Sequence, residues 1–536
     1  MKIKAFFTLL YLVGLLLSTS CQEKAKEKDP GSTVIRDTTI TVANSYSEVF
    51  FDSLALEKFI IQNNIPDSSA AQVRDFYNGR NYQYGWFNAS GLNEVARNFW
   101  SIQSGYISYS GDSSLYNPFL QSVMDSLLVD SSNFKLPDTL QTKTELELTR
   151  HFYRYADRAY RGNENLKLAD LDWFIPRKKI DLRALLDSVF QNNGKNLSDL
   201  EPVNVQYNRL KGFLLKYYGL QQKPDWKIIS TEKKKLQEGD RDGAVSDIKT
   251  RLKFLGDFEE SDTTDVYTAS LSEAVKKYQG RYGLKEDGIV GVALLKEMNR
   301  PIEERIRQIL INMERIRWVP AQPTTDYILV NIPEFKLHAY ENGNYAFDMV
   351  VVVGSTQNNT VIFTGDLKNV VFSPYWNIPS SILKKEVLPG IKKNKNYLAA
   401  HNMEWNGNSV RQKPGPKNSL GLVKFLFPNS YDIYFHDTPS KSLFGESSRA
   451  FSHGCIRLAE PKKMASWILR NDNNWNDAKI TAAMNSGKEK FVVVKQKLPV
   501  FIGYFTAWVD RNGKLNFRDD IYGHDKKMMT QLFGKK

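Results

Sequence analysis

Cysteine is scarce in this sequence of 536 residues, which holds only Cys21 and Cys455. The apolar run at residues 5–17 is too short for a comfortable membrane span. No zinc-finger, RRM or helix-turn-helix pattern stands out, so we expect no nucleic-acid partner. If Cys21 is modified, Cys455 has no disulfide partner in its own chain, and its thiol is a candidate for reactivity.

The N-terminus has the pattern of an export signal. Lys2 and Lys4 precede the apolar run, and three small residues at 18–20 lie just before Cys21. We interpret residues 1–20 as a lipoprotein signal peptide and Cys21 as the acylated first residue of the mature protein. Leu17 departs from the usual pattern, because it lies four residues before the cysteine where three is commoner. A signal peptide with a coincidental cysteine and an uncleaved anchor helix are the alternatives.

The polar, charged residues 21–44 are expected to form a flexible tether. Together with the signal, they predict a lipid-anchored periplasmic protein of a bacterium, with the outer membrane preferred over the inner. The formal net charge of +13 indicates anionic surroundings, such as phospholipid head groups or a carboxylate-bearing polymer.

The length suggests two to four domains, and the first of these is helical. In the segment 45–225 apolar and aromatic residues recur at helical spacing, which predicts a helical scaffold domain. One such stripe holds Leu148, Phe152, Tyr155 and Ala159, and Gly162 is expected to end its helix. These aromatic stripes are interpreted as helix–helix core.

A three-helix module is expected at residues 228–299. Its motifs "EGD", "AVKKYQ" and "DGIVG" are similar to those of the peptidoglycan-binding module that is appended to many wall enzymes. Gly283, Gly288 and Gly291 supply backbone freedom in its turn. A helical spacer without a ligand is the alternative.

After this module, the spacing of the apolar residues changes from a helical period to a strand period. Residues 300–325 are expected to form a connecting helix, which reads as basic and amphipathic, and 326–497 a mainly β domain. The Lys-rich stretch at about 377–416 interrupts the strands and is a candidate lid, and 498–536 form a C-terminal extension. The predicted fold class is therefore α+β and multidomain.

Cys455 lies in the stretch "RAFSHGCIRL", two residues after His453, and His436 ends an alternating strand before it. Two neighbouring β segments could bring His436 to the thiol, and an adjacent imidazole can lower a thiol pKa by several units. Amides around Gly454 and Cys455 could form an oxyanion hole. A buried structural cysteine and a metal site built from Cys455, His453 and His436 are the alternatives. A Cys–His nucleophile site is the strongest interpretation.

The stretch "HDTPSKSLFGESSRAFSHGCIRL" resembles the signature of the L,D-transpeptidases with the YkuD-type catalytic domain. Upstream, "WNIPSSILKKEVLP" and "MERIRWVP" resemble the large YcbB-like branch of that family, in which Arg457 replaces the Asn common elsewhere. The resemblance implies that Cys455 is the nucleophile, His436 the general base and the Asp437 carbonyl an orienting group. It also implies that His453 and the amides of Gly454 and Cys455 hold the oxyanion.

Four further residues are candidates for contacts with the substrate. Arg457 and Arg449 could bind carboxylates or orient the loop, and each could equally be structural. Tyr397 and Trp405 in the lid could cover the donor stem.

The resemblance implies acyl transfer on peptidoglycan that forms 3→3 cross-links through a cysteine thioester, without a metal ion or organic cofactor. It also points to carbapenems as inhibitors. The expected partners are stem peptides, a membrane through the lipid anchor and, as candidates, other enzymes of wall synthesis. An L,D-carboxypeptidase and a non-catalytic peptidoglycan-binding lipoprotein are the alternatives.

Overall fold

The computed structural model describes residues 34–45, 47–129, 136–177, 179–194, 205–222, 226–320 and 323–534. The predicted signal peptide and Cys21 lie outside these residues. The chain divides into two units, one of residues 1–156 with 181–198 and the other of 157–180 with 199–536. Within the described ranges, no helix has both the length and the apolar character needed to cross a membrane.

Helices build the first unit. They are α2 (Ser53–Gln62), α3 (Asp67–Asn78), α4 (Glu94–Ser110), α5 (Pro118–Val129), α6 (Asp138–Arg161, which continues into the second unit) and α7 (Leu182–Gln191), with a hairpin of β1 (Phe87–Asn88) and β2 (Gly91–Leu92). Aromatic rings form the core: the Phe99 ring lies 5.4 Å from that of Trp86 and 5.2 Å from that of Phe152. The stripe predicted on α6 is buried, and Gly162 follows its end with φ +75°.

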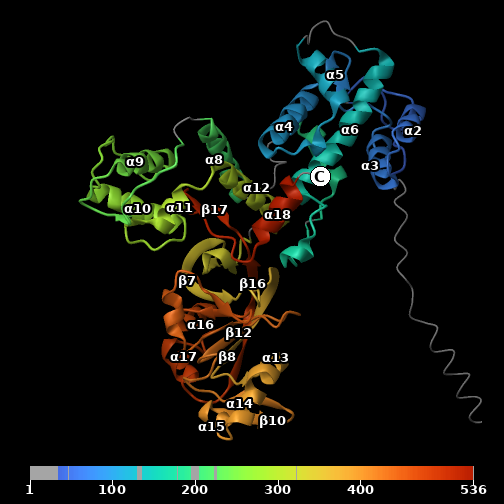
Figure 1. Ribbon diagram of the computed structural model, residues 1–536. Helices are drawn as coiled ribbons and strands as arrows, with labels where there is room; N and C mark the ends of the chain where they lie inside the picture. The colour runs from blue at the N-terminus through green and yellow to red at the C-terminus, as the bar shows by residue number, and fades with distance from the viewer. Residues whose placement is uncertain are drawn as a thin grey trace, which may run out of the picture. The chain divides into compact units, whose positions relative to one another are not determined.

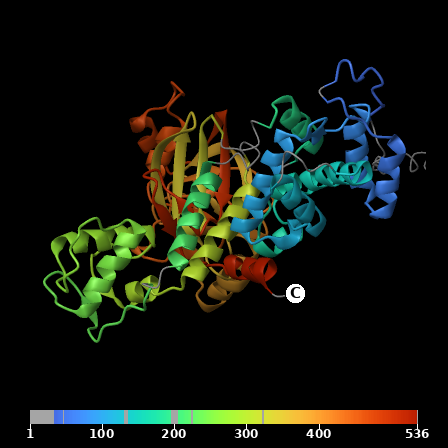
Figure 2. The ribbon, with the colours of Figure 1, turned by 90° about the horizontal axis from the view of Figure 1, so that it is seen from above.

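Two helices and the small module begin the main part of the second unit. Helices α8 (Val205–Gln221) and α12 (Ile302–Trp318) pack side by side (Figures 1 and 2). The module between them consists of β3 (Lys235–Leu236), α9 (Gly243–Leu255), α10 (Ala269–Arg281), β4 (Val290–Gly291) and α11 (Val292–Met298). Gly283 and Gly288 both have φ +70°, as the predicted turn requires, whereas Gly291 is extended.

The β domain is a nine-stranded sheet in the order β14-β7-β15-β13-β12-β8-β16-β5-β6. Strand β6 also pairs with β7, so the sheet closes on itself. Its strands are β5 (Tyr327–Asn331), β6 (Lys336–Glu341), β7 (Asn344–Gly354), β8 (Phe363–Phe372), β12 (Val423–Leu426), β13 (Phe435–His436), β14 (Ala450–Ser452), β15 (Ile456–Leu458) and β16 (Lys490–Gly503). Helices α16 (Pro461–Ile468) and α17 (Asp477–Met484) precede β16. The apolar side chains of this sheet and these helices form one core.

The predicted lid is an ordered insertion with its own small sheet and core. It contains β9 (Trp376–Asn377), α13 (Ser380–Ile382), the π-helical η5 (Leu383–Val387), α14 (Leu388–Lys393), α15 (Tyr397–Ala400), β10 (Met403–Asn406) and β11 (Ser409–Gln412). Figure 1 shows these elements grouped at one end of the β domain. Ile378, Val387 and Val410 are buried together at its centre.

The C-terminal segment continues from the sheet. Because β16 runs without a break to Gly503, the predicted boundary at 497/498 falls inside a strand. After it come β17 (Ala507–Val509), β18 (Leu515–Phe517) and α18 (His524–Phe533). Helix α12 differs from the expected basic amphipathic helix, because most of it is buried and its buried arginines are paired; Arg315, for example, binds Asp525.

Candidate active site

The parallel pairing of β13 and β15 brings the two predicted reacting side chains to one face of the sheet. Phe435 pairs with Ile456 and His436 with Arg457. Phe435 and Ile456 are fully buried in the core, so the neighbours of each along its strand, Cys455 among them, point to the opposite face. The thiol and the imidazole of His436 therefore share this face.

A backbone carbonyl fixes the tautomer of His436. Its Nδ1–H donates to the carbonyl oxygen of Asp437 at 2.5 Å, and because a carbonyl can only accept, the proton is on Nδ1. Nε2 is then free to take a proton. Burial, with a smaller contribution from the charge of Arg457, lowers the pKa of His436 to about 4, although the hydrogen bond to the Asp437 carbonyl acts in the opposite direction, so the imidazole is neutral at pH 7.

The carbonyl that holds His436 is itself tied in place through the side chain of Asp437. This carboxylate accepts hydrogen bonds from the amides of Leu422 and Thr438 and forms an ion pair of 2.6 Å with Lys441. Gly421 packs directly against the carboxylate with φ +60°, where a Cβ would overlap it. The backbone at 437 therefore has little freedom to move.

The Cys455 thiol is protonated in the resting structure, which corrects the expected lowering of its pKa. Its Sγ–H donates to the carbonyl of Asp432 at 3.4 Å. Burial raises the pKa of the thiol to about 11, although hydrogen bonds from Tyr434 and the charge of Arg457 act in the opposite direction. Cys455 and His436 are thus a neutral pair at neutral pH.

The turn before Cys455 leaves only one of the two expected oxyanion donors available. The amide of Gly454 donates to Ser452 Oγ at 3.1 Å, and that hydroxyl donates to the Cys455 carbonyl. For the Cys455 amide, no acceptor is found among the residues described in this structure. Gly454 has φ +111°, a conformation that a side chain would oppose. The geometry therefore favours Cys455 N–H, and not Gly454 N–H, as the backbone donor.

His453 is more exposed than Cys455 and His436. Its side chain is 59% exposed, and its Nε2 lies 3.8 Å from Glu386 Oε1 of the insertion, itself largely exposed. This contact joins the insertion to the loop of the nucleophile.

The two arginines have different surroundings. Arg457 shares the face of Cys455 and His436, and its Nε is buried without a hydrogen-bond partner in the described chain. Arg449 donates from Nε to the Phe444 carbonyl at 3.1 Å and lies over the ring of Phe335. Arg449 therefore has structural contacts within the protein, whereas Arg457 keeps an unused hydrogen-bond donor beside the nucleophile.

The two aromatic residues of the insertion also differ. The Tyr397 ring packs against Gly390 and stacks on His401 with ring centroids 4.1 Å apart, so it belongs to the core of the insertion. Trp405 is 53% exposed and is available for contact.

Sequence reasoning missed three residues that contact the nucleophile, namely Tyr434, Asp432 and Ser452. Tyr434 occurs two positions before His436 in the same alternating strand, which would have identified it as a residue of the same face. Asp432 acts through its carbonyl, for which side-chain chemistry gives no signal. Within the described chain, no group of three or more His, Cys, Asp or Glu residues is placed to hold a metal ion.

Comparison with protein families identifies three domains. Residues 325–494 match the L,D-transpeptidase catalytic domain of the YkuD type, residues 71–214 a scaffold domain, and residues 241–298 a domain described as "Putative peptidoglycan binding domain". The predicted combination of a mainly β catalytic domain with a helical scaffold and a peptidoglycan-binding module is confirmed. Such domains indicate a protein of the cell envelope.

Individual proteins are also similar. A protein of Haemophilus influenzae named "Putative L,D-transpeptidase" is 32% identical over 243 residues, which are 41% of this chain and 49% of that protein. The chain thus spans about half the length of this relative. The L,D-transpeptidase structure from Xylanimonas cellulosilytica (14% identity, TM-score 0.17, 51% of this chain and 100% of that one) is a weaker match. The L,D-transpeptidase structure from Stackebrandtia nassauensis is also a weaker match, with 15% identity and a TM-score of 0.23 over 51% of this chain and 98% of that one. TM-scores this low carry no argument. Residues 325–494 are therefore an L,D-transpeptidase catalytic domain of the YkuD type, in a chain that is similar in sequence to a protein named as an L,D-transpeptidase.

Proposed function

We propose that this protein is a peptidoglycan L,D-transpeptidase that forms 3→3 cross-links through a thioester on Cys455. The observation that carries the proposal is the shared face of Cys455 and His436 within an L,D-transpeptidase domain, with His436 Nε2 unprotonated. A nucleophile next to a base that a third group orients is the arrangement that acyl transfer requires.

In the first half-reaction Sγ attacks the carbonyl carbon of the third stem residue, meso-diaminopimelate, in a donor tetrapeptide. Because the thiol is protonated at rest, its proton passes to His436 Nε2 as the Sγ–C bond forms. The carbonyl electron pair moves to oxygen, which the Cys455 amide stabilises. The C–N bond to the terminal D-alanine then breaks, the proton moves from Nε2 to the departing amine, and a thioester remains.

In the second half-reaction the side-chain amine of diaminopimelate on a neighbouring stem attacks the thioester carbonyl. His436 Nε2 takes the amine proton, the C–S bond breaks and the proton returns to Sγ, so the enzyme is regenerated. Water in place of the amine would give the L,D-carboxypeptidase reaction.

Two further features extend the proposal beyond the reacting groups. The insertion acts as a lid over the donor stem, through exposed Trp405 and its lysines, and its contact from Glu386 to His453 supports this role. His453 contributes to oxyanion binding when substrate is present. Cys21 carries a lipid that anchors the protein in the periplasm, where the peptidoglycan-binding module retains it at the wall.

The proposal is tested by incubating the protein with purified tetrapeptide muropeptides and analysing the products by mass spectrometry. The wild type should give 3→3 dimers, free D-alanine and an acyl adduct on Cys455. Cys455→Ala should give none of these, His436→Ala should be nearly as inactive, and His453→Ala should retain more activity. Tripeptides without dimers would favour the carboxypeptidase. Dimers from Cys455→Ala at a comparable rate would refute the proposal.

A further inference from the structure

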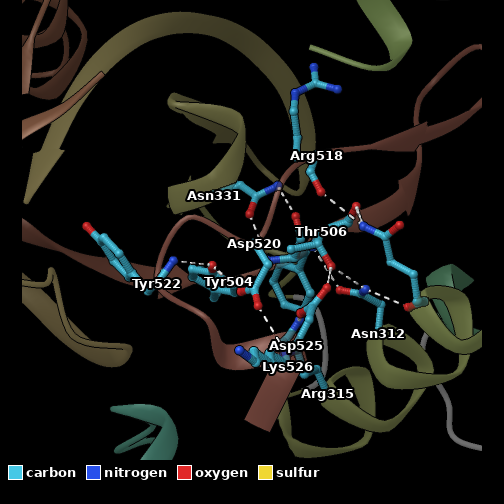
Figure 3. Close-up of polar contacts among 12 residues, drawn as sticks. Asn312, Arg315, Asn331, Tyr504, Thr506, Arg518, Asp520, Tyr522, Asp525 and Lys526 are labelled. Carbon is cyan, nitrogen blue, oxygen red and sulfur yellow. Dashed lines mark hydrogen bonds and ion pairs between the residues drawn. The ribbon is translucent and has the colours of Figure 1, made fainter. Parts of the chain in front are cut away.

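The C-terminal segment forms a hydrogen-bonded network with α12 (Figure 3). Asp525 at the start of α18 accepts from Arg315 at 2.5 Å and from the hydroxyl of Thr506 at 2.6 Å. Asn312 binds both the amide and the hydroxyl of Thr506. Helix α12 therefore fixes the start of α18 and the chain just after β16.

The same network holds Tyr522. Asp520 accepts from the Tyr504 hydroxyl at 2.7 Å and from the amide of Lys526 at 3.0 Å. The Tyr504 hydroxyl in turn accepts from the amide of Tyr522 at 3.0 Å, and the two rings are stacked. In Figure 3 the Tyr522 side chain extends away from this network.

The Tyr522 hydroxyl reaches the loop that follows β7. It donates to the carbonyl of Gly354 at 2.6 Å and accepts from the amide of Thr360 at 3.3 Å, so it joins the two ends of that loop. Thr360 is fully buried. Its hydroxyl accepts from the amide of Gly354 at 2.9 Å and donates to the carbonyl of Gly454 at 2.7 Å.

This last hydrogen bond sets the direction of the Cys455 amide. Gly454 C=O and Cys455 N–H belong to one planar trans peptide, in which the two bonds point in opposite directions. When Thr360 holds the carbonyl on one side, the amide must point to the other. A Thr360 that moved would let this peptide plane rotate about ψ of Gly454 and φ of Cys455, and Gly454, which has no side chain, restricts its own backbone little.

We propose that Thr360 and Tyr522 are positioning residues that orient the Cys455 amide as the oxyanion donor. Through Tyr522, the C-terminal segment beyond the matched catalytic domain completes the active site. The inference rests on the proposed acyl transfer. It differs from it in naming residues that touch neither the substrate nor the reacting atoms.

The test compares two reactions of the same thiol in the full-length protein. Acetylation of Cys455 by p-nitrophenyl acetate passes through a tetrahedral oxyanion, whereas alkylation by iodoacetamide does not. The variants are Thr360→Val and Tyr522→Phe, which remove only the hydroxyls, and Thr360→Ser, which restores one. Tyr345→Phe is the matched control, because its hydroxyl binds Asp348 near the other end of β7.

Removing an oxyanion donor costs about 100- to 1,000-fold, and a misdirected donor should cost less. We expect acetylation to fall by about 10- to 100-fold in Thr360→Val and by about 10-fold in Tyr522→Phe. Alkylation should stay within about twofold in both, and Thr360→Ser and Tyr345→Phe should resemble the wild type.

Unchanged acetylation in both variants would overturn the inference. So would a parallel loss of acetylation and alkylation, or a wild type that is alkylated but never acetylated. Thermal unfolding identifies a variant that fails to fold, in which case the other variant decides. Cross-linking of stem peptides is measured in the same proteins. A wild type that is acetylated but forms no cross-links would refute the proposed function. The inference would still be tested by the acetylation rates of the variants relative to the wild type.

Discussion

At the scale of single residues, burial opposes charge on both members of the reacting pair. The pKa of Cys455 is raised to about 11 and that of His436 is lowered to about 4. Between these values the pair is neutral, so the proton must move during the attack and not before it. The lowered thiol pKa that the sequence suggested would require a shift in the opposite direction on Cys455.

This difference predicts the pH dependence of alkylation. Iodoacetamide reacts with the thiolate, whose fraction rises about tenfold per pH unit below the thiol pKa. The rate at Cys455 should therefore rise steadily from pH 6 towards about 11, as measured by mass spectrometry of the alkylated protein with Cys455→Ala as the blank. A rate that levels off near pH 7 would indicate an ion pair.

The support of His436 by Asp437 predicts a large effect at Gly421. In Gly421→Ala the new Cβ would overlap the Asp437 carboxylate, in addition to the strain of φ +60°. We expect a loss of about 1–2 kcal/mol from the backbone strain, a further loss from the overlap, and severely reduced acylation of Cys455 because the carbonyl that orients His436 moves.

Gly487→Ala separates the two causes. Gly487 has φ +63°, but nothing lies within 4 Å of the added Cβ, so this variant should show the strain alone and retain acylation. Urea unfolding and acetylation of Cys455 measure both quantities. Equal acylation in the two variants would show that Asp437 does not position His436.

The sequence could indicate only those candidate site residues whose side-chain chemistry is distinctive. Cys455, His436 and His453 stood out because a thiol next to imidazoles suggests a reaction. Thr360 and Tyr522 could not be found in that way, because they act on backbone groups that only the folded chain brings near. The direction of the pKa shifts depended likewise on burial, which the sequence does not give.

At the scale of elements, the insertion is a small folded unit and not a loose loop. Its three strands pair among themselves in the order β10-β11-β9, and its core is separate from that of the sheet. The lysine pattern and the interrupted strands predicted an insertion, but they gave no sign of this core. Periodicity predicted helix α12 correctly, but it did not predict the burial of the helix. Arginines in a sequence indicate an exposed surface, and the buried partners of these arginines are known only from the fold.

The separate core predicts that the insertion can be removed without unfolding the sheet. Replacing residues 379–415 with a short Gly-Ser bridge should leave one cooperative thermal transition for the β domain and leave Cys455 open to iodoacetamide. Cross-linking of muropeptides should be lost, because nothing then covers the donor stem.

The single substitution Glu386→Gln is the matched control. It keeps the insertion and removes only an exposed pair with His453, worth about 1 kcal/mol or less, so it should cost little activity. If the shortened protein cross-links as well as its parent, the insertion is not a lid.

At the scale of the whole molecule, the sequence predicted which kinds of domain are present better than how they divide. Periodicity and motifs identified a helical scaffold, a three-helix module and a β domain in the correct order. The predicted boundaries depended on changes of composition and stay predictions. Two features of the chain cross them: residues 157–180 belong with the second unit, and β16 crosses residue 498. Contacts between residues distant in sequence decide such divisions.

The remaining prediction concerns the anchor, which lies outside the described residues. Because the chain has only two cysteines, fatty-acid labelling can be assigned without ambiguity. Cys21→Ser should abolish labelling by a palmitate analogue in cells and move the protein from the membrane fraction to the soluble periplasm, or leave it as an uncleaved precursor. Cys455→Ser is the matched control and should keep both the label and the membrane fraction, because its serine lies far from the signal in sequence. If Cys21→Ser fractionates as the wild type does and carries as much label, Cys21 is a coincidental residue, and the net positive charge and the peptidoglycan-binding module must retain the protein in the envelope.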